Sequence, residues 1–262
     1  MKMLLLASAA LLTLPGAAWA ADLPAQAVVP APVAALPAPA WSGFYAGAHL
    51  GLHRSDTTFR VHSYLSFFEN VDDSTYLPSG DLDHNSVMGG GQVGLNLQTG
   101  PFLLGLEADV SVFGEASTTT FNTRYVSAVD SWPVATRVRS QLDYLGTARW
   151  RLGAVFDRLL VYATAGLALG NVNYRVSYEE QASRGFPYVG AGRKDAVQIG
   201  YAIGGGLEYA FTGNLSVKAE YLYYNLGDAL LNTTLVNEGG EAFTHRIETG
   251  GHIGRVGLNF RL

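Results

Sequence analysis

Residues 102–112 read FLLGLEADVSV, and every second side chain in this stretch is apolar. The intervening positions include two acids, Glu107 and Asp109. Successive side chains of a β-strand point to opposite faces of the sheet. The stretch therefore predicts a strand with one apolar face and one face that holds charges. The apolar face comprises Phe102, Leu104, Leu106, Ala108, Val110 and Val112.

Seven further segments between Trp41 and the end of the chain show the same period of two, and they bring the predicted number of strands to eight. Their apolar sets are Phe44, Ala46, Ala48, Leu50 and Leu52; Val87, Val93, Leu95 and Leu97; Leu142, Tyr144, Ala148, Trp150 and Leu152; Leu159, Val161, Ala163, Ala165, Leu167 and Leu169; Val197, Ile199, Tyr201, Ile203, Leu207 and Tyr209; Leu215, Val217, Ala219, Tyr221 and Tyr223; and Val256, Leu258, Phe260 and Leu262.

The charged side chains within these segments all fall on the face opposite the apolar set. A charge that faces lipid at mid-bilayer costs about 2–4 kcal/mol, so the sorting predicts an apolar outer face and a charged interior. Five acids and five bases cancel formally, which suits buried charges because they need partners. The predicted interior ionic network consists of Glu107, Asp109, Asp143, Arg149, Arg151, Glu208, Lys218, Glu220, Arg255 and Arg261.

The connections between the predicted strands alternate in length. Residues 99–101, 156–158 and 212–214 are short turns, whereas residues 54–85, 114–139, 173–195 and 225–247 form four long loops. Short periplasmic turns and long extracellular loops are typical of transmembrane barrels. Backbone groups in hydrocarbon must all be paired, so such a sheet has to close.

Aromatic side chains gather at the ends of the predicted strands, as expected where hydrocarbon meets water. One girdle near the short turns comprises Trp41, Phe44, Phe102, Trp150, Tyr209, Phe211 and Phe260, and a thinner one at the other end comprises Phe113, Tyr221 and Tyr223. A soluble barrel of the lipocalin type is the alternative, but it would present charges on its outer face. The sequence thus favours an eight-stranded antiparallel transmembrane β-barrel.

Composition excludes several other classes of protein. The chain has 262 residues, 15% charged residues, a net charge of −5 and no cysteine. Seventeen Lys and Arg residues spread along the chain do not predict a nucleic-acid partner. The absence of cysteine excludes thiolate metal sites and cysteine nucleophiles.

The first forty residues divide into two segments that precede the barrel. Residues 1–20 have a basic start, an apolar stretch and small residues at Ala18 and Ala20, which predicts a signal peptide cleaved after Ala20. Residues 21–40 hold five prolines and predict an extended segment, which is either a periplasmic tether or an ordinary frayed terminus without a role of its own. The barrel is expected to span residues 41–262.

Several sequence blocks resemble those of one family of bacterial proteins. Residues 41–51 (WSGFYAGAHLG) resemble the opening of the small porin-family, opacity-like outer-membrane proteins of Gram-negative bacteria. Residues 160–168 (LVYATAGLA), 218–227 (KAEYLYYNLG) and 255–262 (RVGLNFRL) resemble them too, as does the Pro/Ala tether. The outer-membrane immunogenic proteins are the most similar subgroup, and the resemblance covers nearly the whole chain.

The resemblance implies a surface antigen located in the outer membrane. It implies outer-membrane lipid, lipopolysaccharide and the barrel-assembly machinery as partners. Chains of this type usually end in Phe, which the assembly machinery favours. This chain ends in Leu262, so we expect insertion with weaker recognition of the terminal signal.

Two motifs with possible chemistry have simpler interpretations. Gly89, Gly91 and Gly94 match a dinucleotide-binding pattern, but a strand continues through them where a helix would have to begin. The histidines are scattered and predict no metal site. A haem site in the first long loop remains an alternative, with His53, His62, Tyr64, Tyr76 and His84 as its candidate residues.

An enzyme is the other class of protein to be considered. His84 with Ser86, or His245 with Glu248, could in principle form part of a hydrolytic site near the outer rim. The equal number of interior acids and bases instead favours structural ion pairs. We therefore predict a non-enzymatic barrel without catalytic, cofactor or metal residues, which contributes envelope structure and surface exposure. A narrow ion or solute channel and a loop-bound ligand of unknown identity are the alternatives.

Overall fold

Ten β-strands make up nearly all of the described chain. The computed structural model describes residues 41–64, 80–114, 117–126, 131–180, 188–235 and 241–262, so the predicted signal peptide and tether lie outside it. The strands are β1 (Gly43–Tyr64), β2 (Gly80–Asp81), β3 (His84–Thr99), β4 (Phe102–Phe113), β5 (Ser117–Val126), β6 (Ser131–Phe156), β7 (Leu159–Glu180), β8 (Tyr188–Ala210), β9 (Leu215–Leu235) and β10 (Glu241–Arg261). Among these residues, no helix is long and apolar enough to cross a membrane.

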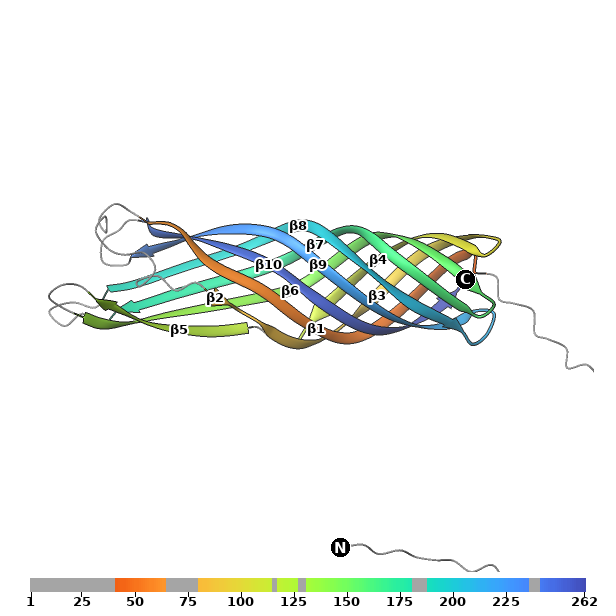
Figure 1. Cartoon of the computed structure of the whole chain (residues 1–262), viewed down its shortest axis with the longest axis horizontal. Coiled ribbons are helices and arrows are strands. Elements are labelled where there is room, and N and C mark those ends of the chain that lie inside the picture. The colour runs from red at the N-terminus through yellow and green to blue at the C-terminus, as the bar shows by residue number, and fades with distance from the viewer. Residues whose placement is uncertain (1–40, 65–79, 115–116, 127–130, 181–187, 236–240) are drawn as a thin grey trace, which may run out of the picture. The chain divides into compact units, whose positions relative to one another are not determined.

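Eight of the strands pair in a closed circuit. The order is β1, β3, β4, β6, β7, β8, β9 and β10, and β10 pairs back onto β1 from Tyr45 opposite Arg261 to Tyr64 opposite Phe243. All pairings are antiparallel. The sheet therefore closes into a barrel whose strands run obliquely to its axis (Figure 1). The prediction of an all-β antiparallel fold is confirmed.

The short turns lie together at one end of the barrel, beside the C-terminus (Figure 1). Gly100 and Asp157 adopt positive φ angles of 58° and 54° in the β3–β4 and β6–β7 turns. Such backbone angles allow a tight reversal between adjacent strands. The third short connection joins β8 to β9 through residues 211–214.

The outer face over the half of the barrel near the short turns is apolar. Leu50 is 70% exposed, Leu106 47% and Val256 60%, and each faces away from the barrel interior. We call this surface the apolar band. It extends on β4 from Phe102 to Val112, as the period of two predicts.

The strands continue well beyond the apolar band, which corrects the prediction of four long loops. β1 runs to Tyr64, β7 to Glu180 and β9 to Leu235, and β5 continues the line of β4 along β6. Much of residues 54–85, 114–139, 173–195 and 225–247 is thus strand. The reason is that the polarity inverts: Val138 and Tyr174 point inward, while Arg139 and Arg175 point outward. Assigning every apolar residue to the lipid face cannot detect such segments.

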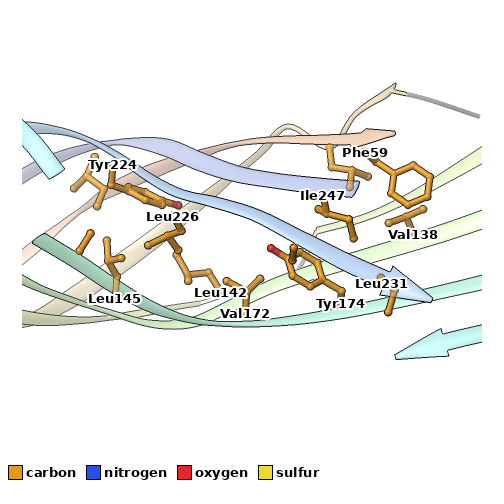
Figure 2. Packing of buried hydrophobic residues seen from close by; sticks show 14 of the residues in the cluster. Phe59, Val138, Leu142, Leu145, Val172, Tyr174, Tyr224, Leu226, Leu231 and Ile247 are labelled. Atoms are coloured by element: carbon orange, nitrogen blue, oxygen red, sulfur yellow. The ribbon is translucent and has the colours of Figure 1, made fainter. Parts of the chain in front are cut away.

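The inverted region encloses an apolar core, shown in Figure 2. Tyr174 and Val138 are fully buried in it, with Phe59, Leu231 and Ile247 from three other strands. Burial also lowers the pKa of His245 to about 4, because the charged imidazolium is poorly solvated there. The interior of the barrel beyond the apolar band therefore holds packed apolar side chains.

The ladder between β8 and β9 is interrupted. Pairing runs from Ala210 opposite Ser216 to Tyr201 opposite Asn225, and resumes only at Ala191 opposite Thr234. Residues 192–200 and 226–233 flank this interruption, which we call the β8–β9 gap. Gly227 has a φ of 75° within it, and the Lys194 ammonium donates a hydrogen bond across it to the carbonyl of Leu230 at 2.6 Å.

A bulge in β6 overturns one predicted register. The β6–β7 pairing shifts between Leu142 and Tyr144, so Leu142 is 9% exposed and lies in the apolar core, whereas it was predicted to face lipid. An extra residue in one strand reverses the side to which the following side chains point. The prediction failed because a period of two counts straight through a bulge.

Candidate functional site

Eight of the ten predicted interior charges meet in one cluster inside the apolar band. Each of them is at most 5% exposed. We call this group the ionic cluster, and it consists of Glu107, Asp109, Arg149, Arg151, Glu208, Lys218, Glu220 and Arg255.

The register of the sheet places opposite charges side by side. Glu107 on β4 is the cross-strand partner of Arg149 on β6, and their side chains approach to 2.7 Å. Arg255 on β10 is the partner of Glu220 on β9, with a separation of 2.5 Å. Inward positions recur at every second residue of each strand. An inward acid on one strand therefore lies beside an inward base at the partner position of the neighbouring strand.

Other ion pairs cross the barrel interior. β4 and β9 lie four strands apart in either direction around the circuit, yet Lys218 Nζ is 2.9 Å from Glu107 Oε1. Arg255 reaches Asp109 at 3.0 Å, and Arg149 reaches Glu220 at 3.3 Å. Side chains from opposite walls therefore meet inside the barrel at this level.

Arg151 connects the cluster toward the short-turn end. It pairs with Glu208 at 2.7 Å and donates a hydrogen bond to the hydroxyl of Tyr45 at 2.6 Å. Its guanidinium carbon also lies 4.0 Å from the ring centroid of Tyr162. Arginine suits this position because its planar group bonds at its edge and stacks on its face.

Hydroxyl and amide groups satisfy the remaining carboxylate oxygens. Tyr45 donates to Glu107 at 2.7 Å, Thr147 to Asp109 at 2.6 Å and Tyr162 to Glu220 at 2.9 Å. Ser216 and Asn259 both donate to Glu208, at 2.6 and 2.9 Å. Sequence reasoning recognised this face as polar but did not pick out these partners, because alternation shows which side a hydroxyl is on and not which acid it meets.

The balance of charge explains how so many ionised groups can be buried. The cluster holds four acids and four bases, so it is formally neutral. Removing a charge from water costs several kcal/mol, and this cost is offset only where partners and hydrogen bonds are complete. The arrangement is that of a cross-linked structural network.

Two of the ten predicted residues lie elsewhere. Asp143 sits at the β6 bulge, half-buried, and accepts hydrogen bonds from the amides of Asn171 and Asn173. Arg261 lies at the short-turn end, where its guanidinium carbon is 4.6 Å from the ring centroid of Trp41.

Trp41 also corrects the predicted aromatic girdle. It is fully buried, and its indole N–H donates to the carbonyl of Asp157 at 3.4 Å. It forms a second apolar cluster with Leu103, Leu160, Tyr162 and Ala210, on the short-turn side of the ionic cluster. Trp150 is exposed on the outer face, but it lies opposite Leu106, in the middle of β4, rather than at the short-turn end. The remaining predicted members of that girdle are exposed on the outer face: Phe44, Phe102, Tyr209, Phe211 and Phe260. At the other end Tyr221 faces outward, whereas Phe113 packs partly buried against the apolar core.

The glycines that match a dinucleotide-binding pattern lie within strand β3. Gly94 faces inward, and a Cβ atom there would come within 2.3 Å of the hydroxyl of Tyr45. The glycine thus makes room for a side chain that bonds the ionic cluster. In the part of the chain that the structure describes, no group of three potential ligands is arranged to hold a metal.

The histidines considered for haem or catalysis do not assemble on the surface. His53 is buried between the hydroxyls of Ser86 and Tyr224, at 3.2 and 2.8 Å, so Ser86 is bonded to His53 rather than to His84. His245 points inward, while Glu248, three residues on, is exposed. The side chains of His62, Tyr64 and Tyr76 lie outside the described part of the chain.

Comparison with known proteins agrees with this architecture. Residues 7–260 match the family model of the outer membrane protein beta-barrel domain. The 31 kDa outer-membrane immunogenic protein of Brucella melitensis is 30% identical over 263 residues, which cover both chains in full. The 22 kDa outer membrane protein of Rhizobium leguminosarum is 28% identical over 71% of this chain and 65% of its own.

Among solved structures, the outer membrane protease OmpT of Escherichia coli matches 84% of this chain and 97% of its own, with 13% identity and a TM-score of 0.49. The relatives are named as proteins of the outer membrane, which is where this chain resides. With a closed antiparallel sheet, an apolar outer band and a match over nearly its whole length, the chain belongs to the family of the outer membrane protein beta-barrel domain.

Proposed function

We propose that this protein is a non-enzymatic structural and surface-exposed component of the outer membrane, with an interior closed to diffusion. The observation that best supports this proposal is the ion pair between opposite walls of the barrel, in which Lys218 and Glu107 are 2.9 Å apart. A barrel of eight strands has an interior that side chains just fill. The ion pairs fill it here.

Two apolar layers support the closed interior. The cluster around Trp41 and Leu160 lies on the short-turn side of the ionic cluster, and the core around Tyr174 and Val138 lies on the other side. A solute would have to displace all three layers. This favours a structural role over the alternative of a narrow channel.

The contacts of the buried carboxylates support a role without catalysis. Glu107, Asp109, Glu208 and Glu220 each contact an arginine or lysine and accept further hydrogen bonds. A general acid or base must instead reach a substrate. Carboxylates held by several bases are suited to stabilising the barrel.

Conductance across a planar bilayer tests the proposal. The refolded protein should show no steady single-channel steps, because its lumen is filled. A variant that thins all three layers should introduce steps. It combines Glu220→Ala and Arg255→Ala in the ionic cluster with Leu160→Ala and Tyr174→Ala in the two apolar layers.

The matched control is Asp228→Ala with Arg246→Ala, which removes an exposed pair 3.2 Å apart and should leave the bilayer silent. Heat-modifiable migration on a gel establishes that each variant is folded. Steady steps from the unmodified protein would contradict the closed interior and support the channel.

A further inference from the structure

Four arginines gather on the outer face of the barrel beyond the apolar band. Three of them are cross-strand partners in one continuous row: Arg139 on β6, Arg175 on β7 and Arg193 on β8. The fourth, Arg137, lies two residues before Arg139 on β6, farther from the apolar band. All four are exposed. We call them the arginine patch.

The patch has few carboxylates to balance it. Among the described side chains, Arg137 and Arg175 form no ion pair, and Arg139 reaches only the amide oxygen of Gln141, at 3.4 Å. Arg193 alone of the four pairs with an acid, Asp195, at 2.8 Å. By contrast, Arg54 and Arg246, which point outward on β1 and β10, both contact aspartates.

Such a row is unfavourable unless something neutralises it. Adjacent strands are about 4.8 Å apart, so the three row members lie within about 10 Å of one another. Like charges directly opposite each other destabilise a sheet. An anion bound across the row would relieve this repulsion and gain charge-assisted hydrogen bonds.

The surface between the arginines is shaped to receive a small anionic group. A hollow there is lined by the patch and by Thr118, Ser177, Ala191 and Gly192. Thr118 is the cross-strand partner of Arg139, and Ser177 that of Arg137, so hydroxyl donors flank the guanidinium groups. Small residues at 191 and 192 leave one side open. Arginine forks and hydroxyls together match the oxygens of a phosphate.

The height of the patch identifies the source of the phosphate. Val197 and Ile199 on β8 are 56% and 69% exposed and belong to the apolar band. Arg193 lies four residues before Val197 on the same strand, on the side away from the short turns. Four residues span about 13 Å along a strand, or about 10 Å along the axis of a barrel with strands tilted by about 40°. Arginine side chains extend several ångströms back toward the membrane surface. The guanidinium groups therefore reach the headgroup layer, which extends about 5–8 Å beyond the hydrocarbon.

We propose that the arginine patch binds the phosphorylated headgroup of a lipid in the leaflet opposite the short turns. Short turns lie on the periplasmic side of such barrels, so this is the outer leaflet, where lipopolysaccharide is the expected phosphorylated lipid. The site lies outside the barrel, so it does not depend on whether the interior conducts.

Calorimetric titration of the folded barrel in uncharged detergent tests the site. The probes are a phosphorylated lipid A, the same lipid without phosphates, and inorganic phosphate. The phosphorylated lipid should bind at least about tenfold more tightly than either of the others, since charged hydrogen bonds contribute on the order of 1.5–3 kcal/mol each. Added salt should weaken its binding.

Variants assign the binding to the patch. Arg139→Gln with Arg175→Gln should weaken binding by about tenfold or more. The matched control, Arg54→Gln with Arg246→Gln, removes two outward arginines that contact aspartates and should leave affinity unchanged. Arg175→Lys keeps the charge but loses the bidentate hydrogen bonding of a guanidinium group. Its affinity for the phosphorylated lipid should therefore lie between those of the unmodified protein and the double variant.

Equal affinities of the patch and control variants would overturn the proposal. Inorganic phosphate that binds as tightly as the lipid would overturn the lipid assignment. Gel migration before and after heating verifies that every variant is folded, and a conductance result of either sign leaves these outcomes unchanged.

Discussion

At the residue scale, Glu107 is the centre of the molecule's electrostatics. It lies within 3.4 Å of Lys218, Arg149, Arg151 and Arg255, and it accepts a hydrogen bond from Tyr45. Those bases come from three strands, β6, β9 and β10. A single carboxylate thus ties together walls that are not adjacent in the sheet.

Neutralising Glu107 should leave an excess positive charge in the cluster. We predict that Glu107→Gln lowers the free energy of unfolding by about 3–5 kcal/mol, as breaking a buried ion pair does. Lys218→Met should also be costly, but the double variant should cost clearly less than the sum of the two, because it restores neutrality. Urea unfolding in micelles, followed by tryptophan fluorescence, measures all three.

An exposed pair provides the control for this cycle. Asp228→Asn, which removes the partner of Arg246, should change stability by no more than about 1 kcal/mol. Additive costs for Glu107→Gln and Lys218→Met would mean that the two side chains are not coupled across the lumen.

The membership of the cluster illustrates what a sequence can predict at this scale. Glu107 and Arg149 could be assigned to the interior because each stands between apolar residues in a segment where every second residue is apolar. Asp143 obeys the same alternation, yet a bulge sets it among asparagines. Contacts such as Lys218 with Glu107 join residues 111 positions apart, and no local pattern contains that information.

At the element scale, the strands are longer than the apolar alternation suggests. Along β7 the outward residues are apolar up to Leu169, and farther along Arg175 points outward while Tyr174 and Val176 are buried. The strand period persists while the environment outside the barrel changes from lipid to water. Segment identity was therefore predictable, whereas strand ends were not, because an inverted pattern resembles a polar loop.

The β8–β9 gap should be the part of the barrel wall that opens most easily. We predict that every second amide in residues 192–200 and 226–233, on the side facing the gap, exchanges its hydrogen faster than amides in residues 202–210, where the ladder is continuous. Hydrogen exchange of the micelle-bound protein, resolved by NMR, measures this. Uniform protection along β8 would contradict an interrupted ladder.

At the scale of the whole molecule, the apolar band matches a membrane. On β4 it runs from Phe102 to Val112, and ten steps of about 3.3 Å, tilted by about 40°, project to about 25 Å along the axis. This is the usual height of the lipid-facing band of such barrels. The period of two was sufficient to predict it, because lipid imposes the same requirement on every strand.

The depth of a charge within the band should determine its cost. Leu106 lies near the middle, opposite Trp150 on β6, and Val112 lies at the far edge. Leu106→Arg should destabilise the barrel in lipid vesicles by about 2–4 kcal/mol, and Val112→Arg by about 0–1 kcal/mol. Equilibrium unfolding from vesicles compares them, and equal costs would show that the band is not centred in the bilayer.

The order in which the cluster's charges occur along the chain bears on biogenesis. β4 brings two acids and β6 two bases, β8 then adds one acid, and β9 adds one of each sign. After β9 the summed charge of the cluster is therefore −1, and Arg255 on β10 brings it to zero. The same strand, β10, closes the barrel by pairing with β1. Electroneutrality and circular closure are thus reached in the same event, so an intermediate lacking its final strand carries an uncompensated carboxylate as well as two open edges.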